Sequence, residues 1–132
     1  MCRQITDGTH YTPTYVQNGI RFLSVVNIRE NRIDFDSTKF IDIEEHKRLI
    51  KRCKPNPYDI LLTKIGTVGL AAVIPEIDFE FSIFVSVALL KMKEGVNPYY
   101  IMAYLNSSFT RFQIERALKG IGVPDLHLEN IR

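Results

Sequence analysis

The sequence predicts a single α+β domain, with a strand-rich, curled sheet and helices near residues 43–52 and 98–118. Three observations support this fold class. The 132 residues fit one compact domain and leave little room for two. Apolar residues make up 45% of the chain and charged residues 24%, as in ordinary globular domains. Short runs of β-branched and aromatic residues, separated by turn signals, fill the middle of the chain and are typical of strands.

The first part of the chain is expected to be a loop followed by a strand. Residues 5–19 are rich in Thr, Gly and Pro, and Asp7-Gly8 and Asn18-Gly19 are turn signals. Residues 21–28 carry the β-branched and aromatic side chains that favour a strand. A polar turn over residues 29–32 then leads back into extended structure.

A helix is predicted over residues 42–52. Acidic residues lie at its start and basic residues at its end, as the helix dipole favours, and Pro55 and Pro57 end it. Residues 58–66 and 70–75 then predict two buried strands of a hairpin, with Gly66 and Gly69 at its turn.

Residues 81–90 alternate in a way that predicts one central strand, because both of its faces are mainly apolar. Asn97-Pro98 has the form of a helix N-cap followed by proline at the first helical position. We expect a helix, or a pair of helices, from there to about Leu118.

Several classes of protein are not indicated. Cys2 and Cys53 form no CxxC pair and have no histidines at zinc spacing, so a disulfide framework is not expected and a reducing compartment is. No secretory signal is evident, and the longest apolar stretch, residues 81–90, is too short to span a bilayer. We expect a cytoplasmic protein with no membrane association.

Motifs that could carry catalysis are incomplete. Asn97-Pro98-Tyr99-Tyr100 is similar to the motif with which DNA amino-methyltransferases hold a flipped base, but the second proline and a glycine-rich methyl-donor loop are missing. Residues 64–69, KIGTVG, do not have the P-loop order. The three histidines share no metal spacing, and His46 is expected on a solvated helix face. We therefore expect no enzyme activity, no metal and no cofactor.

Basic residues cluster twice in a chain whose net charge is only +2. Residues 47–54, KRLIKRCK, contain five positive charges, and Arg111, Arg116 and Lys119 form a second group. Such clusters can be solvated helix faces. Two basic helices separated by Thr- and Gly-rich loops could instead flank a groove that holds phosphates.

Four segments in order resemble the target-recognition domain of type I restriction-modification specificity subunits. They are ITDGTHYTPTY (5–15), FIDIEEHKRLIKRCKPNPYDILLTKIGTVGLAAVI (40–74), NPYYIMAYLNS (97–107) and GIGVPDLHLENI (120–131). The order and spacing agree over nearly the whole chain. The family's segment before the Asp-Gly-Thr-His stretch is reduced to MCRQ, and its spacer helices after Ile131 are absent. We therefore expect residues 1–132 to form one recognition domain.

This resemblance implies a function without catalysis. Such a module recognises a sequence in double-stranded DNA and directs a methyltransferase (modification) subunit and a restriction subunit to it. Three loops would contact the DNA, with lysines on phosphates and His10 and Thr12 on base edges. The loop residues are Thr9, His10, Thr12 and Tyr15; Lys64, Gly66, Thr67 and Gly69; and Lys119, Gly120 and Gly122. The alternatives are a module that binds only protein and a fragment of a DNA adenine methyltransferase.

Overall fold

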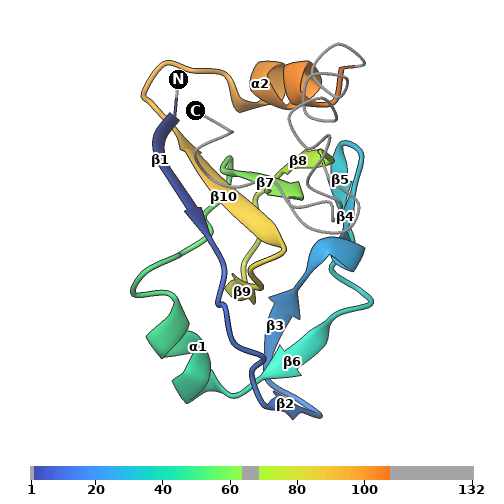
Figure 1. Cartoon of the computed structure of the whole chain (residues 1–132), viewed down its shortest axis with the longest axis vertical. Coiled ribbons are helices and arrows are strands. Elements are labelled where there is room, and N and C mark those ends of the chain that lie inside the picture. Colours follow the sequence, from blue (N-terminus) through green and yellow to red (C-terminus); the bar gives the residue numbers. More distant parts are fainter. Residues whose placement is uncertain (1, 64–68, 108–132) are drawn as a thin grey trace, which may run out of the picture.

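The computed structural model describes residues 2–63 and 69–107, and these residues form a mixed α+β domain (Figure 1). The elements in chain order are β1 (Cys2–Asp7), β2 (Tyr15–Val16), β3 (Ile20–Leu23), η1 (Val25–Asn27), β4 (Ile28–Arg29), β5 (Arg32–Ile33), β6 (Lys39–Ile41), α1 (Ile43–Leu49), β7 (Ile60–Thr63), β8 (Ala71–Val73), β9 (Phe81–Ile83), β10 (Val87–Met92) and α2 (Pro98–Leu105).

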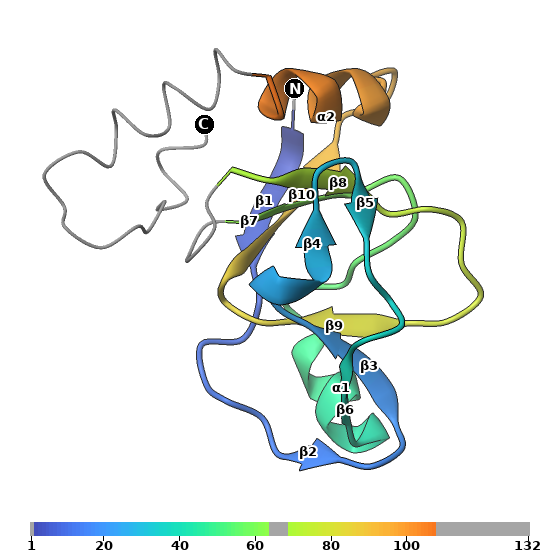
Figure 2. The ribbon, with the colours of Figure 1, turned by 90° about the vertical axis from the view of Figure 1, so that its right-hand side faces the viewer.

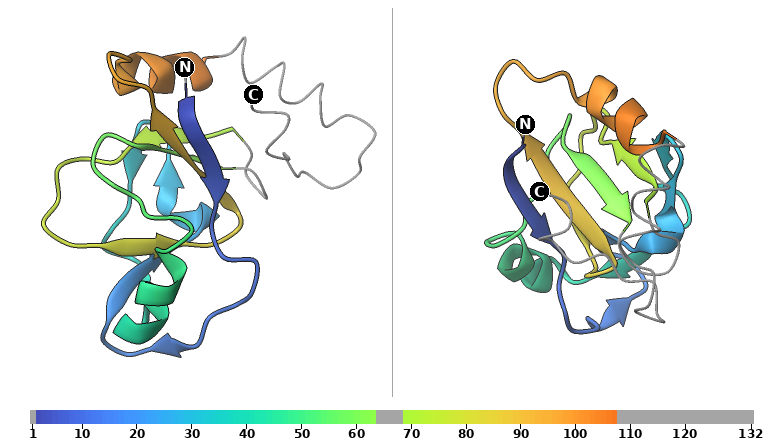
Figure 3. Two further views of the ribbon diagram at one scale, coloured as in Figure 1. Left: turned by 90° about the vertical axis from the view of Figure 1, so that its left-hand side faces the viewer. Right: turned by 45° about the horizontal axis from the view of Figure 1, so that its top comes forward.

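The first sheet is antiparallel and has the strand order β1-β10-β7-β8. The central strands, β10 and β7, consist mainly of apolar residues because other parts of the domain pack on both faces of this sheet. One face contributes Leu61, Val87 and Leu89 to a core cluster that also contains Leu23 and Phe81 of the second sheet. The opposite face packs beneath Ile101 of α2. Figure 3 shows α2 lying across the sheet, with the second sheet and α1 beyond its other side.

The second sheet has the order β2-β6-β3-β9, in which β3 and β9 are parallel and the other pairs are antiparallel. Helix α1 packs against β9, and the small β4–β5 hairpin lies beside β8 (Figure 2). Asn31 at the hairpin tip has a φ of 67°, and its backbone N–H donates to the Ala71 carbonyl at 3.1 Å. The β4–β5 hairpin is therefore attached to β8 of the first sheet.

Two expectations for the first thirty residues were wrong in part. Residues 5–7 belong to β1, which pairs with β10 through Ile5 and Leu90, and the loop begins only at Gly8. The strand expected over residues 21–28 ends at Leu23, where the chain turns into η1. The buried side chain of Asn27 fixes this turn by donating to the carbonyls of Asp34 and Ser37, contacts that composition cannot reveal.

Residues 81–83 and 87–90 are extended and buried, but the prediction of one continuous strand was wrong. The chain leaves the second sheet after Ile83 as β9 and enters the first sheet at Val87 as β10. A turn closed by the Val87 N–H on the Phe84 carbonyl, at 3.0 Å, joins them. The alternating pattern continues through this turn because the residues on both sides of it are buried, so periodicity alone cannot show the break.

Both helices begin where the sequence places them, and the predicted β7–β8 hairpin is confirmed. Helix α1 is shorter than expected because the chain turns at Ile50 to bury Cys53. Asn97 caps α2, as predicted, by accepting from the N–H groups of Tyr99 and Tyr100 at 2.9 and 3.4 Å. That helix ends at Leu105, and the remainder of the predicted helix, residues 108–118, lies outside the described residues.

Candidate nucleic-acid interface

The loop after β1 is held against the turn between β9 and β10. Thr9 donates its N–H to the Ile83 carbonyl at 3.1 Å and accepts from the Val85 N–H at 2.9 Å. Gly8 lies so close to this turn that a Cβ atom on it would be 2.1 Å from the Ile83 carbonyl oxygen. The glycine of the Asp-Gly-Thr-His stretch is therefore required by the packing of two backbone segments, and it fixes where the loop emerges.

Arg52, just beyond α1, holds the same loop from the other side. Its guanidinium donates to the carbonyls of Asp7 and Gly8 at 2.8 and 2.6 Å, and to Asp7 Oδ1 at 3.3 Å. Nε2 of His10 lies 3.2 Å from that carboxylate oxygen. Asp7 therefore links the start of the loop both to the exposed His10 and to the basic segment after α1.

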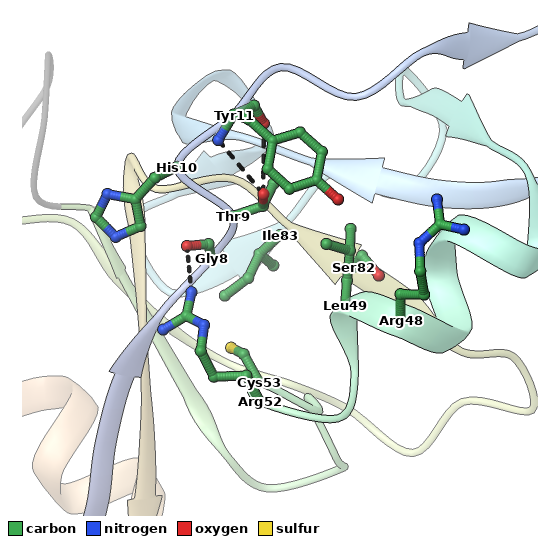
Figure 4. A pocket seen from close by; sticks show the side chains of 10 residues that line it. All are labelled: Gly8, Thr9, His10, Tyr11, Arg48, Leu49, Arg52, Cys53, Ser82 and Ile83. Atoms are coloured by element: carbon green, nitrogen blue, oxygen red, sulfur yellow. Dashed lines mark hydrogen bonds between the residues drawn. The ribbon is translucent and has the colours of Figure 1, made fainter.

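A pocket of about 390 Å³ opens between this loop and α1 (Figure 4). Apolar groups of Leu49, Cys53 and Ile83 form part of its lining. Burial raises the pKa of the Cys53 thiol, so the thiol stays protonated at neutral pH. The remaining lining residues are Gly8, Thr9, His10, Tyr11, Arg48, Arg52 and Ser82.

The exposed side of α1 and the turn after it carries positive charge. Lys47, Arg48 and Lys51 are exposed, and Arg48 makes only a loose ion pair with Glu45, at 3.7 Å. Because Arg48 is exposed and the N···O separation is long, this pair contributes little to stability and leaves the guanidinium free to meet a ligand. The predicted basic cluster therefore contains a solvated face, and Arg48 on that face borders the pocket.

The expectation that His46 would be solvated was wrong, because its side chain is fully buried between α1 and β9. Nδ1 of His46 is 2.7 Å from the Ser82 hydroxyl, and Nε2 is 3.5 Å from a carboxylate oxygen of Glu80. Desolvation by burial lowers the pKa of His46, although Glu80 partly opposes this shift. His46 thus attaches the basic helix to the second sheet in its neutral form.

The structure places Thr9, His10 and Thr12 in the loop after β1, as predicted. The expectation that Tyr15 belongs to this loop was wrong, because Tyr15 lies in β2, where it pairs with Ile41 of β6. His10, Thr12 and Tyr15 are exposed, and the Lys39 ammonium lies 4.9 Å from the centre of the Tyr15 ring. Thr9 is buried, and its hydroxyl accepts from the Tyr11 N–H at 3.4 Å. His10 and Thr12 can therefore reach a ligand, whereas the Thr9 side chain stabilises the loop itself.

The second predicted loop leaves the same end of the first sheet. Asp7 pairs with Ala88, which in turn pairs with Leu62, so β1 and β7 both end there. Gly69 returns the chain to β8 with a φ of 94°, a conformation that favours glycine. The other predicted residues, Lys64, Gly66, Thr67, Lys119, Gly120 and Gly122, lie outside the described residues.

This site also contains Tyr11, Arg48 and Arg52, which were not predicted as members of it. The basic run was visible in the sequence, but nothing local shows that it packs against a loop 45 residues earlier in the chain. Tyr11 is half exposed. The sequence signal that could have indicated Tyr11 as a site residue was its position directly after His10 in a polar loop.

Within the described ranges, 2–63 and 69–107, no helix has the length and apolar character needed to cross a membrane. No group of three or more His, Cys, Asp or Glu side chains in this part of the chain could hold a metal ion.

Solved structures with a similar fold come from type I restriction-modification systems. The HsdS subunit from Thermoanaerobacter tengcongensis superposes with a TM-score of 0.63 over 97% of this chain, at 14% sequence identity. The chain has the fold of part of a type I specificity subunit. A chain from a structure of the type I R-M system, described in terms of its complex assembly and conformational transition, also has a TM-score of 0.63 and 14% identity, over 96% of this chain.

This chain spans less than a third of either of those proteins, 28% of the HsdS subunit and 29% of the chain from the assembled system. No family profile matches the sequence, and no curated protein matches it. The similarity to HsdS is therefore one of fold.

Proposed function

We propose that this chain is a DNA target-recognition domain of a type I restriction-modification specificity subunit, and that it recognises double-stranded DNA without catalysing a reaction. The observation that carries the proposal is a polar loop, residues 8–12, held by hydrogen bonds beside the exposed cations of α1, in a fold similar to that of HsdS. In the complete system, a methyltransferase (modification) subunit and a restriction subunit would act at the site that this domain selects.

The two kinds of side chain at this interface would have different roles. Lys47, Arg48 and Lys51 would contact phosphates, which position a protein on DNA but do not specify sequence. His10 and Thr12 would contact base edges, because each can donate or accept a hydrogen bond. Arg52 would act mainly by positioning the loop, because its charge is already paired with Asp7.

Lys64 and Lys119 remain proposed phosphate contacts, and Gly66, Thr67, Gly69, Gly120 and Gly122 remain proposed loop residues at the duplex. The position of the β7–β8 connection, which ends at Gly69, supports a shared DNA contact. It leaves the first sheet at the same end as the 8–12 loop. Strands β1 and β7 flank β10, so the two loops start roughly 10 Å apart, a distance that one DNA groove can accommodate.

The salt dependence of duplex binding tests the phosphate contacts. A single module should bind non-specific duplex with a dissociation constant of about 10⁻⁴ to 10⁻⁶ M at physiological salt. Arg48→Ala should lower the magnitude of the log–log salt slope by about 0.9, as expected for one lost phosphate contact. Lys93→Ala is the matched control, because this exposed lysine follows β10 at the opposite end of the sheet. His10→Ala should change the preference among sequences with little effect on the slope.

The same measurements separate the alternatives. A folded protein that binds no duplex at low salt would contradict DNA recognition by this domain and favour a module that binds only protein. Calorimetric binding of the methyl donor would favour a methyltransferase fragment instead. Equal slopes for Arg48→Ala and Lys93→Ala would show that the α1 surface is not the phosphate contact.

A further inference from the structure

The pocket between the 8–11 loop and α1 is large enough to hold a small molecule. Its volume of about 390 Å³ falls within the range of roughly 300–1,000 Å³ that is usual for small-molecule sites. Figure 4 shows the Tyr11 ring across the opening from Arg48 and Leu49. Tyr11 is 52% exposed, so part of its ring can contact a ligand.

The chemistry of this pocket suits a planar group attached to an anion. Leu49 and Ile83 provide apolar contact, and the buried Cys53 thiol adds no charge because its pKa is raised. The Tyr11 ring and the Arg48 guanidinium offer the flat surfaces on which unstacked bases stack in nucleic-acid complexes. Arg48 can also meet a phosphate. These are the requirements of a single nucleotide.

We propose that this pocket binds one unstacked base of the bound DNA, with the base stacked on Tyr11. The proposal rests on the proposed function, since it assigns a further contact to the same DNA-binding surface. The loop is suited to this role because hydrogen bonds to the β9–β10 turn and to Arg52 hold Gly8 and Thr9 in place. The Thr9 hydroxyl in turn accepts from the Tyr11 N–H at 3.4 Å.

The energetic balance determines which DNA should occupy the pocket. Stacking on one aromatic side chain improves affinity by about 5- to 150-fold per base. Extracting a paired base from a duplex costs a similar amount, and the cost is least for a mismatched or already unpaired base. The pocket should therefore leave matched duplexes intact and select DNA that carries an unpaired base.

Fluorescence anisotropy with the full 132-residue chain tests this inference. Two labelled duplexes would be compared at low salt, identical except for one additional unpaired adenine in the second. We expect the bulged duplex to bind at least about fivefold more tightly than the matched one. Tyr11→Ala should abolish this preference, whereas Tyr11→Phe, which keeps the ring, should retain it. Tyr100→Ala is the matched control, because Tyr100 is an exposed tyrosine on α2.

Each outcome bears on one proposal or on both. Equal binding of both duplexes by the unaltered chain would overturn the base pocket and leave duplex recognition standing. A preference for the bulge that persists in Tyr11→Ala would also overturn it, because bulged DNA is easily bent and could bind better for that reason alone. Failure of the folded chain to bind either duplex would overturn both proposals. Circular dichroism of each variant would establish that it is folded.

Discussion

Gly8→Ala should destabilise the domain far more than an ordinary glycine substitution. The added Cβ would lie 2.1 Å from the Ile83 carbonyl oxygen and 2.5 Å from the Phe84 carbonyl carbon, both backbone atoms that no rotamer change can move. Relief requires the loop and the β9–β10 turn to separate enough to remove these overlaps. That movement would break the hydrogen bonds that Gly8 and Thr9 make to Val87, Ile83 and Val85.

The magnitude follows from these contacts. Three backbone hydrogen bonds are worth about 0.5–1.5 kcal/mol each, and overpacking of a tight site costs about 1–3 kcal/mol. We therefore expect a loss of about 3 kcal/mol or more in the free energy of unfolding, a large share of the roughly 5–15 kcal/mol typical of a domain. The variant should also lose DNA affinity, because the 8–12 loop would no longer be held beside α1.

Gly95→Ala is the control for this experiment. Gly95 has a φ of 86°, and nothing lies within 4 Å of the position that a Cβ would occupy. Its substitution tests conformational strain without crowding and should cost about 1 kcal/mol. Urea unfolding followed by circular dichroism would measure both variants. A Gly8→Ala protein no less stable than Gly95→Ala would show that the loop does not cross the turn as closely as described.

Two further predictions concern buried ionisable groups. Because burial lowers the pKa of His46 from its usual 6.5, the unfolded state binds a proton at a higher pH than the folded state. The contribution of His46 to stability should therefore be fully present above about pH 6.5 and fall as the pH drops below it. In urea unfolding between about pH 5 and 8, His46→Gln should lose less stability on acidification than the unaltered chain. Identical pH profiles for the two proteins would contradict a lowered pKa for His46. Lys91→Met should cost about 3 kcal/mol or more, because it leaves Asp59, 2.6 Å away in the native protein, as an uncompensated buried carboxylate. Asp59→Asn combined with Lys91→Met should restore much of that stability, and a double variant no better than the single one would show that the two groups are not coupled.

Local signals were sufficient for much of the fold. The Asn97-Pro98 pair predicted the start of α2 because an N-cap depends only on the side chain and the next two or three N–H groups. The β7–β8 hairpin followed from two apolar runs around a glycine-containing turn. The ordered segments around Asp7-Gly8 and residues 40–74 predicted the fold of a type I specificity subunit, and the superposition on HsdS confirms it.

The tertiary structure alone decided what surrounds the site. The break between β9 and β10 is not visible in the sequence because apolar residues on both sides of it are buried, in two different sheets. His46 lies in a charged stretch that predicts a solvated face, yet Ser82, 36 residues later, provides its buried partner. Arg52 reaches Asp7 and Gly8 only because the chain returns α1 to the end of β1. Periodicity and capping act over a few residues, whereas these contacts depend on the path of the whole chain, and that path places the basic helix beside the polar loop.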